Sequence, residues 1–170
     1  LTEDEDRNKF IVENIEKFCK EGRKIIILSD RRNHIELLQN KFKESNPNVS
    51  SGLYMGGIKQ SVLKENEKCQ VIFGTYSLAH EGLDIPALDT LIMATPKSDV
   101  VQAVGRILRE TKTEKKSPYI VDIVDEYDVL VKQSRVRKKF YQKTGFNIIK
   151  TKQEAVEEEQ KQGYLFKEDP

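Results

Sequence analysis

Two arginines one helical turn apart are the residues best placed for chemistry in this sequence. Arg106 and Arg109 stand at positions i and i+3, so a helix through them places both guanidinium groups on one face. Neighbouring guanidinium groups repel each other unless an anion lies between them, and a phosphate matches their planar fork. Gly105 costs a helix about 1 kcal/mol relative to alanine, which favours a close approach at this point. The alternative is a pair of ordinary surface ion pairs.

Polar residues follow four apolar runs of the sequence. These residues are Ser29, Asp30 and Arg31; Gly74 and Thr75, with Glu81, Gly82 and Asp84 shortly after; Lys97 and Ser98; and Gln102 with the two arginines. Loops at the carboxyl ends of parallel strands gather at one edge of a sheet, where ligands bind. Asp84 can accept a hydrogen bond from a ribose hydroxyl, or it can serve an ordinary turn. Thr75 can offer a hydroxyl and a backbone N–H to a phosphate, or make a strand-end hydrogen bond.

Short apolar runs alternate with amphipathic stretches along most of the chain. The runs at 24–28, 51–54, 71–73, 91–93 and 119–124 predict buried strands. The stretches at 6–21, 35–46, 58–67, 100–108 and 126–143 predict helices, with Asp99 as a cap of the fourth. In the last helix, Val136 and Phe140 are predicted to face inward. This alternation predicts an α/β fold with a parallel sheet that is covered on both faces.

The pattern weakens after residue 145. Residues 151–162 are highly charged and predict a helix, and 163–170 predict a fraying tail. We therefore predict a domain over 1–145 and a charged helical extension with a tail over 146–170.

The composition excludes several classes of protein. A formal net charge of +1 provides no overall basic field, so any contact with nucleic acid must come from a local patch or a few residues. Cys19 and Cys69 stand far apart and predict buried reduced thiols rather than a metal site. No run is long enough to span a membrane, which predicts an intracellular protein without membrane contact. A start at Leu1 instead of methionine suggests a piece of a longer polypeptide.

The sequence contains no GxxxxGK[ST] phosphate loop. Asp125 and Glu126 follow an apolar run like a magnesium-binding acid pair, but no phosphate loop precedes them. A complete nucleotide site of the P-loop type is therefore not predicted within these residues.

Three segments together resemble the C-terminal helicase domain of superfamily 2, the second RecA-like domain of such motors. IIILSDRRNHI at 25–35 is similar to motif IV, VIFGTYSLAHEGLDIP at 71–86 to motif V, and QAVGRILR at 102–109 to motif VI. GGIKQ at 56–60 resembles the glycine turn before the short helix that precedes motif V. The segments stand in the family's order and spacing over about residues 6–145.

The resemblance implies a role for each matching residue. Arg109 would be the arginine finger that reaches the γ-phosphate of ATP, Arg106 its partner at the phosphates, and Gln102 a support of the same site. Gly82 and Asp84 would lie against the nucleotide. Arg31, Gly74 and Thr75 would contact the nucleic-acid backbone. ATP and its Mg²⁺ would be held by an N-terminal RecA-like domain of the same polypeptide, and these residues alone would be inactive.

Two positions depart from the DEAD-box pattern of RNA helicases. Gln102 stands where those proteins have histidine, and Glu81 where they usually have arginine. Both resemble the DNA-directed branch of superfamily 2, which includes proteins of large DNA viruses. DNA is therefore expected as the partner rather than RNA.

Two other classes of protein compete with the motor domain. The first is a non-catalytic nucleic-acid-binding module with a decayed helicase fold, which would have no use for Arg106, Arg109 and Asp84. The second is a flavodoxin-like nucleotide-binding domain, which the absence of a glycine-rich phosphate turn disfavours.

Overall fold

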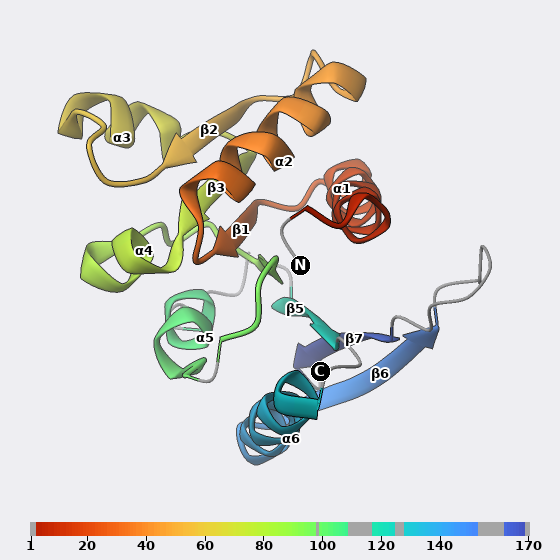
Figure 1. Cartoon of the computed structure of the whole chain (residues 1–170). Coiled ribbons are helices and arrows are strands. Elements are labelled where there is room, and N and C mark those ends of the chain that lie inside the picture. The colour runs from red at the N-terminus through yellow and green to blue at the C-terminus, as the bar shows by residue number, and fades with distance from the viewer. Residues whose placement is uncertain (1–2, 98, 109–116, 125–127, 153–161, 169–170) are drawn as a thin grey trace.

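The computed structural model describes residues 3–97, 99–108, 117–124, 128–152 and 162–168. Helices and strands alternate along most of this chain (Figure 1). In chain order they are α1 (Glu5–Lys20), β1 (Ile25–Ser29), α2 (Arg32–Ser45), β2 (Ser51–Tyr54), α3 (Gln60–Asn66), β3 (Val71–Thr75), α4 (Tyr76–Gly82), β4 (Thr90–Met93), α5 (Val101–Leu108), β5 (Tyr119–Val124), α6 (Asp128–Lys143), β6 (Phe146–Lys152) and β7 (Gln162–Glu168).

The strands form one sheet in the order β2-β3-β1-β4-β5-β7-β6. The first five are parallel to one another, whereas β7 is antiparallel to both β5 and β6. Every residue of β1, β3 and β4 is buried, which explains why apolar residues follow one another in these strands, because side chains on both faces of a parallel sheet are covered. The predicted α/β fold is confirmed.

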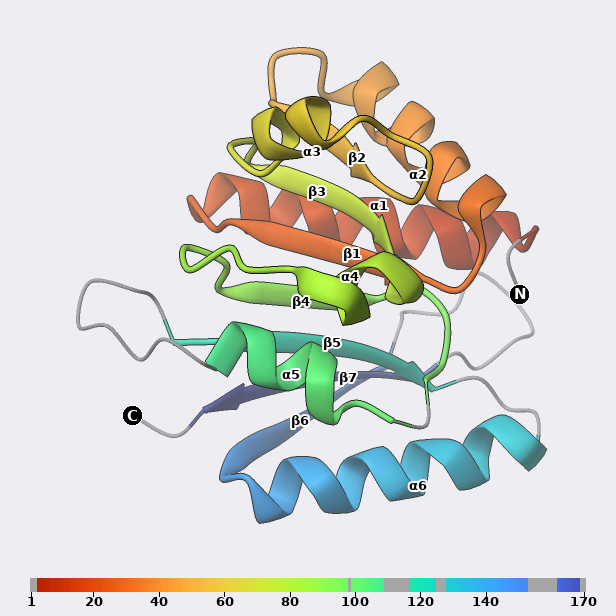
Figure 2. The same cartoon turned by 90° about the vertical axis from the view of Figure 1, so that its left-hand side faces the viewer.

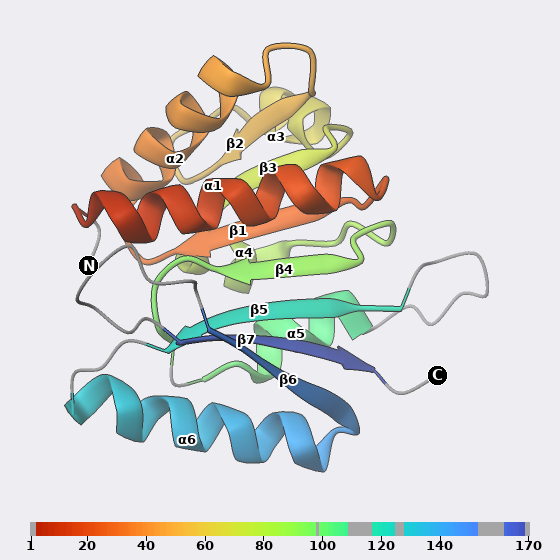
Figure 3. The same ribbon diagram turned by 90° about the vertical axis from the view of Figure 1, so that its right-hand side faces the viewer.

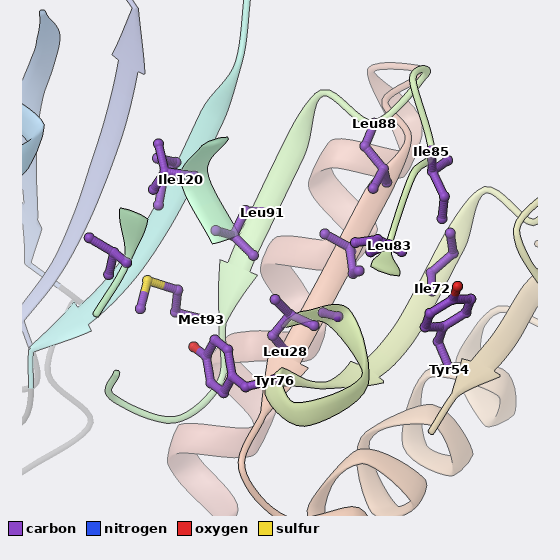
Figure 4. Close-up of a cluster of buried hydrophobic side chains, with 14 of the residues drawn as sticks. Leu28, Tyr54, Ile72, Tyr76, Leu83, Ile85, Leu88, Leu91, Met93 and Ile120 are labelled. Carbon is purple, nitrogen blue, oxygen red and sulfur yellow. The ribbon is translucent and has the colours of Figure 1, made fainter. Parts of the chain in front are cut away.

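Each face of the sheet has its own helical layer and its own core. The helices α1 and α2 cover one face and bury Ile11, Ile35 and Phe42 against it (Figure 3). The helices α3, α4 and α5 cover the other face, with α6 on the same side (Figure 2). There the inward side chains of the central strands pack against Tyr76 of α4 (Figure 4). In the described part of the chain, no helix is long and apolar enough to cross a membrane.

The helix α4 is an element that the sequence reasoning missed, since no helix is predicted over residues 76–82. Thr75 starts this helix at the end of β3 by accepting a hydrogen bond from the backbone N–H of Leu78 at 3.4 Å. Seven residues are too few to show a clear apolar period, so only the cap signals the helix.

The prediction for the C-terminal region is wrong where the structure describes it. Residues 146–152 and 162–168 are strands rather than parts of a helix and a tail, and 153–161 lie outside the described residues. Gly145, with φ of +90°, turns the chain from α6 into β6. Strand pairing satisfies the free backbone groups at the edge of β5, and this outweighs the helical preference of a charged sequence. A domain boundary at residue 145 stays a prediction.

A buried ion pair fastens α6 to the sheet. The Arg137 guanidinium donates two hydrogen bonds to the Asp122 carboxylate, at 2.6 and 2.9 Å, and the Tyr141 hydroxyl donates to the same group at 3.0 Å. Burial alone would lower the pKa of Arg137, but its contacts with Asp122 raise it on balance. Val136, predicted to face inward, is 58% exposed, because Arg137 occupies the inward position beside it.

Both cysteines are free, and each is half-buried where buried reduced thiols are predicted. Burial, with Glu16 close by, raises the pKa of the Cys19 thiol to about 11. The thiol is therefore protonated near neutral pH.

Candidate functional site

The register of the sheet brings the polar loop residues to one edge. Ser29 at the end of β1 pairs with Thr75 at the end of β3, and Leu28 pairs with Met93 at the end of β4. The segments that follow these three strands therefore leave the sheet side by side at its carboxyl edge (Figure 2). This is the edge at which open α/β sheets bind ligands.

Thr95, which the sequence reasoning did not single out, joins the three segments. Its hydroxyl accepts a hydrogen bond from the Asp30 backbone N–H at 2.9 Å, and its carbonyl accepts one from the Tyr76 hydroxyl at 2.9 Å. Lys97 lies 3.7 Å from the Asp30 carboxylate and 5.3 Å from the centre of the Tyr76 ring. The carboxyl edge is thus a connected structure rather than a set of independent loops.

A buried relay of hydrogen bonds fixes the turn that carries Arg31. The Asn8 Oδ1 atom lies 2.8 Å from His34 Nε2, and Ser29 Oγ lies 2.9 Å from His34 Nδ1. Because Oδ1 can only accept, Nε2 carries the imidazole proton, and the Ser29 hydroxyl donates to Nδ1. Ser29 Oγ in turn accepts from the Arg31 backbone N–H at 3.2 Å. Burial, together with the charge of Arg7, lowers the pKa of His34 to about 4, which keeps it neutral.

Arg32 connects the same turn to the glycine turn at 56–57. Its guanidinium donates a hydrogen bond to the carbonyl of Gly56. Gly57 has φ of +85°, a conformation that side chains rarely adopt, which explains why a glycine stands there. The segments similar to motif IV and to the glycine turn are therefore in contact.

The three residues predicted to contact nucleic acid differ in their exposure. The side chain of Arg31 is exposed and has no partner among the residues that the structure describes. Gly74 and Thr75 are buried. A Cβ atom at Gly74 would lie 3.1 Å from the Tyr54 carbonyl, so strand packing accounts for this glycine, and the Thr75 hydroxyl is used in capping α4. Only Arg31 presents its side chain freely.

The helices that carry motifs V and VI lie side by side on one face of the sheet. Contacts between α4 and α5 join them, and Val100 and Val104 pack into the core that also holds Leu83. Gly82 ends α4. Asp84, two residues further on, is exposed and makes no hydrogen bond or ion pair within the described ranges. Its carboxylate is therefore available to a ligand.

The backbone of α5 includes Gln102 and Arg106, and Arg109 lies outside the described residues. Asp99 accepts a hydrogen bond from the Val101 backbone N–H at 3.1 Å, as expected for a residue that starts the helix. Gly105 is exposed, and a Cβ atom there would meet nothing within 4 Å. No close approach inside the described chain explains this glycine.

Residues 7–111 match the helicase conserved C-terminal domain family. A protein of Acanthamoeba polyphaga mimivirus, whose name describes an ATP-dependent RNA helicase, is 42% identical over 148 residues, which are 85% of this chain and 28% of that protein. A protein of African swine fever virus with the same kind of name is 32% identical over 134 residues, 74% of this chain and 26% of that protein. The chain spans about a quarter of the length of these relatives.

The fold is also similar to a solved helicase structure. The helicase MrfA bound to DNA and AMPPNP superposes with a TM-score of 0.61 at 20% identity, over 81% of this chain and 20% of that one. At this identity the likeness concerns the fold. The family match, the viral relatives and the fold agree, and the chain belongs to the helicase conserved C-terminal domain family.

Proposed function

We propose that the chain is the C-terminal motor domain of an ATP-dependent nucleic-acid helicase or translocase. The observation that supports this most is the placement of the motif V and motif VI helices on one face, with Arg31 exposed at the carboxyl edge and Asp84 exposed after α4. An N-terminal P-loop domain of the same polypeptide completes the site. The two RecA-like domains then share one nucleotide.

Arg109 is the arginine finger in this proposal, with Arg106 beside it at the phosphates and Gln102 in support. Phosphoryl transfer is catalysed mainly by positioning and by stabilising charge, and an arginine supplied across an interface is worth about 10³–10⁵ in rate. ATP supplies the γ-phosphoryl group, and Mg²⁺ is held with it by the P-loop domain.

Asp84 and Gly82 hold the nucleoside side of the ligand. The exposed carboxylate of Asp84 suits a ribose hydroxyl, which donates a hydrogen bond to it. Gly82 leaves room for the nucleotide at the end of α4. These residues bind and orient, and they move no proton.

Arg31 contacts the phosphate backbone of the nucleic acid, as its exposed guanidinium allows. Gly74 contributes through its backbone groups, and Thr75 through its backbone or the proton of its hydroxyl, whose oxygen caps α4. We propose DNA as the preferred track on the basis of Gln102 and Glu81. The names of the two viral relatives refer to RNA.

ATP hydrolysis by the chain alone and by the two-domain polypeptide tests the proposal. The 170 residues alone should show no turnover above background, while the longer polypeptide should hydrolyse ATP faster with nucleic acid present. Turnover by the chain alone that survives repurification would overturn the split site. A longer polypeptide with an intact P-loop and no stimulated hydrolysis would favour the decayed module. Matched DNA and RNA strands decide the preferred track.

A further inference from the structure

Charge is distributed very unevenly along this nearly neutral chain. Residues 129–152 include eight lysines and arginines and no acidic residue, whereas the whole chain has a net charge of +1. The remaining residues therefore carry a net charge of −7. Most of these cations belong to α6.

Four of the α6 cations lie on one exposed face. We name Lys132, Arg135, Lys139 and Lys143 the α6 basic stripe; all four are exposed. With 3.6 residues per turn they fall within an arc of about 80°, and with a rise of 1.5 Å per residue they extend over roughly 16 Å. Arg137 and Tyr141 are on the opposite, buried face.

The stripe is unfavourable for the isolated helix. Arg135 and Lys139, and Lys139 and Lys143, are like charges at i and i+4, which repel each other. Among the residues whose side chains the structure describes, which do not include Asp128 at the start of α6, no acidic side chain pairs with any member of the stripe. Two exposed lysines on other elements do lie close to a carboxylate: Lys9 is 4.0 Å from Glu13, and Lys68 is 3.1 Å from Glu65. An unbalanced row of cations fits an external polyanion.

The fold holds the stripe in a fixed place. The pairing of Arg137 with Asp122 anchors the buried face of α6 to β5, so the opposite face is presented rigidly. The helix lies on the side of α4 and α5, at the end of the sheet away from α2 and α3 (Figure 2). It is therefore a surface separate from the turn that carries Arg31.

We propose that the α6 basic stripe is a second contact surface for the phosphate backbone of a nucleic acid. The choice of nucleic acid among polyanions rests on the proposed function. Lysine and arginine contacts to phosphates carry no sequence information, so this surface binds without sequence preference. It adds a second contact with the phosphate backbone to the one proposed for Arg31.

Salt-dependent binding tests the stripe against a matched control. The stripe variant combines Lys132→Gln, Arg135→Gln, Lys139→Gln and Lys143→Gln. The control variant removes the same number of exposed charges from α1 and α2, on the other face of the sheet, by Lys9→Gln, Lys17→Gln, Lys20→Gln and Lys43→Gln. Fluorescence anisotropy with labelled single-stranded DNA and RNA of mixed sequence gives the affinity at several salt concentrations, and thermal melting checks that both variants are folded.

The stripe variant should bind at least about tenfold more weakly at low salt. The slope of log K against log salt should become shallower by about 0.7 for each phosphate that the variant no longer neutralises. The control variant should keep nearly the native slope. A third variant with arginine at the three lysine positions of the stripe should bind like the native chain, because it keeps the charge.

Equal slopes and affinities for the stripe and control variants would overturn the proposal. So would native oligonucleotide binding by a stripe variant that no longer binds phosphatidylserine vesicles, since the partner would then be a membrane surface. If Arg31→Ala weakens binding while the stripe variant binds like the native chain, the proposal for the stripe is contradicted and the proposed function is not. A native chain that binds neither DNA nor RNA at low salt would contradict both.

Discussion

At the scale of single residues, side chains that take no part in chemistry set the geometry of the candidate site. Thr95 joins the segments after β1, β3 and β4, and His34 connects α1, β1 and α2 through two hydrogen bonds. His34 makes both bonds as the neutral imidazole with its proton on Nε2, and Ser29 donates to Nδ1. A second proton would put a charge on a buried ring near the charge of Arg7.

Stability should therefore fall as the pH drops from about 6.5 to about 4. The folded pKa of His34, about 4, lies below the unfolded value of 6.5. Between these pH values His34 is protonated in the unfolded chain and neutral in the folded chain, which favours unfolding. At about 1.4 kcal/mol per pKa unit, the loss can reach roughly 3 kcal/mol. Urea unfolding at several pH values measures it.

The two histidines of the chain provide the control. His34→Asn should flatten the pH dependence of unfolding in this window, at some cost in stability because the relay is broken, whereas His80→Asn, at an exposed position, should retain it. The assignment of His34 fails if His80→Asn removes the dependence and His34→Asn does not.

The exposed residues of the candidate site could be predicted from the sequence better than the hydrogen bonds of His34. Arg31 stands next to a recognisable strand end, so its place at the carboxyl edge could be predicted, whereas Asp84 follows the helix α4, which the sequence did not indicate. The partners of His34 stand 5 and 26 residues away, on β1 and α1, and only the packed fold brings them together. An isolated histidine gives no signal of such a relay.

At the scale of elements, α5 contains an exposed glycine for which the described chain gives no packing reason. Gly105→Ala should stabilise the chain by about 1 kcal/mol, because alanine is the better helix former and a Cβ atom meets nothing within 4 Å. The melting temperature should rise by roughly 2–4 °C. If the P-loop domain approaches the helix at this point, the same change should lower the ATPase rate of the two-domain polypeptide. An unchanged rate would show that the glycine has no such role.

The attachment of α6 allows a comparison within one helix. Arg137→Met should cost about 3–5 kcal/mol, because it leaves the buried Asp122 carboxylate without its ion pair. Arg135→Met, two residues away on the exposed face, should change stability by less than about 0.5 kcal/mol. Chemical denaturation of both variants measures the difference. Similar small losses for both would mean that the Arg137–Asp122 pair does not hold α6.

Elements with a strong local signal could be predicted, and those that depend on partners could not. The β-branched runs of β1 and β5 are recognisable because both of their faces are buried. The inward position of Arg137 could not be predicted, since the sequence around it does not show that it pairs with Asp122 of β5. The strands β6 and β7 depend on the free edge of β5, and a charged sequence gives no sign of that edge.

At the scale of the whole molecule, several exposed groups have no partner among the residues that the structure describes. Asp84, Arg31 and the α6 basic stripe have no counterpart among the described residues, and the sequence contains no phosphate loop. The proposed function assigns these groups to a second domain and a nucleic acid, and it predicts that the chain folds without either of them.

The effect of Arg109 substitutions on ATP turnover and on folding tests the arginine finger, the central claim of the proposed function, most directly. If Arg109 reaches out to a phosphate held by the other domain, it contributes only about 0–1 kcal/mol to the stability of this chain, so Arg109→Ala should leave the melting temperature nearly unchanged. In the two-domain polypeptide it should lower kcat by roughly 10³ or more, because the charge of the transition state loses its partner. Arg109→Lys should restore little, since lysine keeps the charge but lacks the planar fork. A near-native kcat for Arg109→Ala, or a clear loss of stability with normal turnover per folded molecule, would contradict the arginine finger.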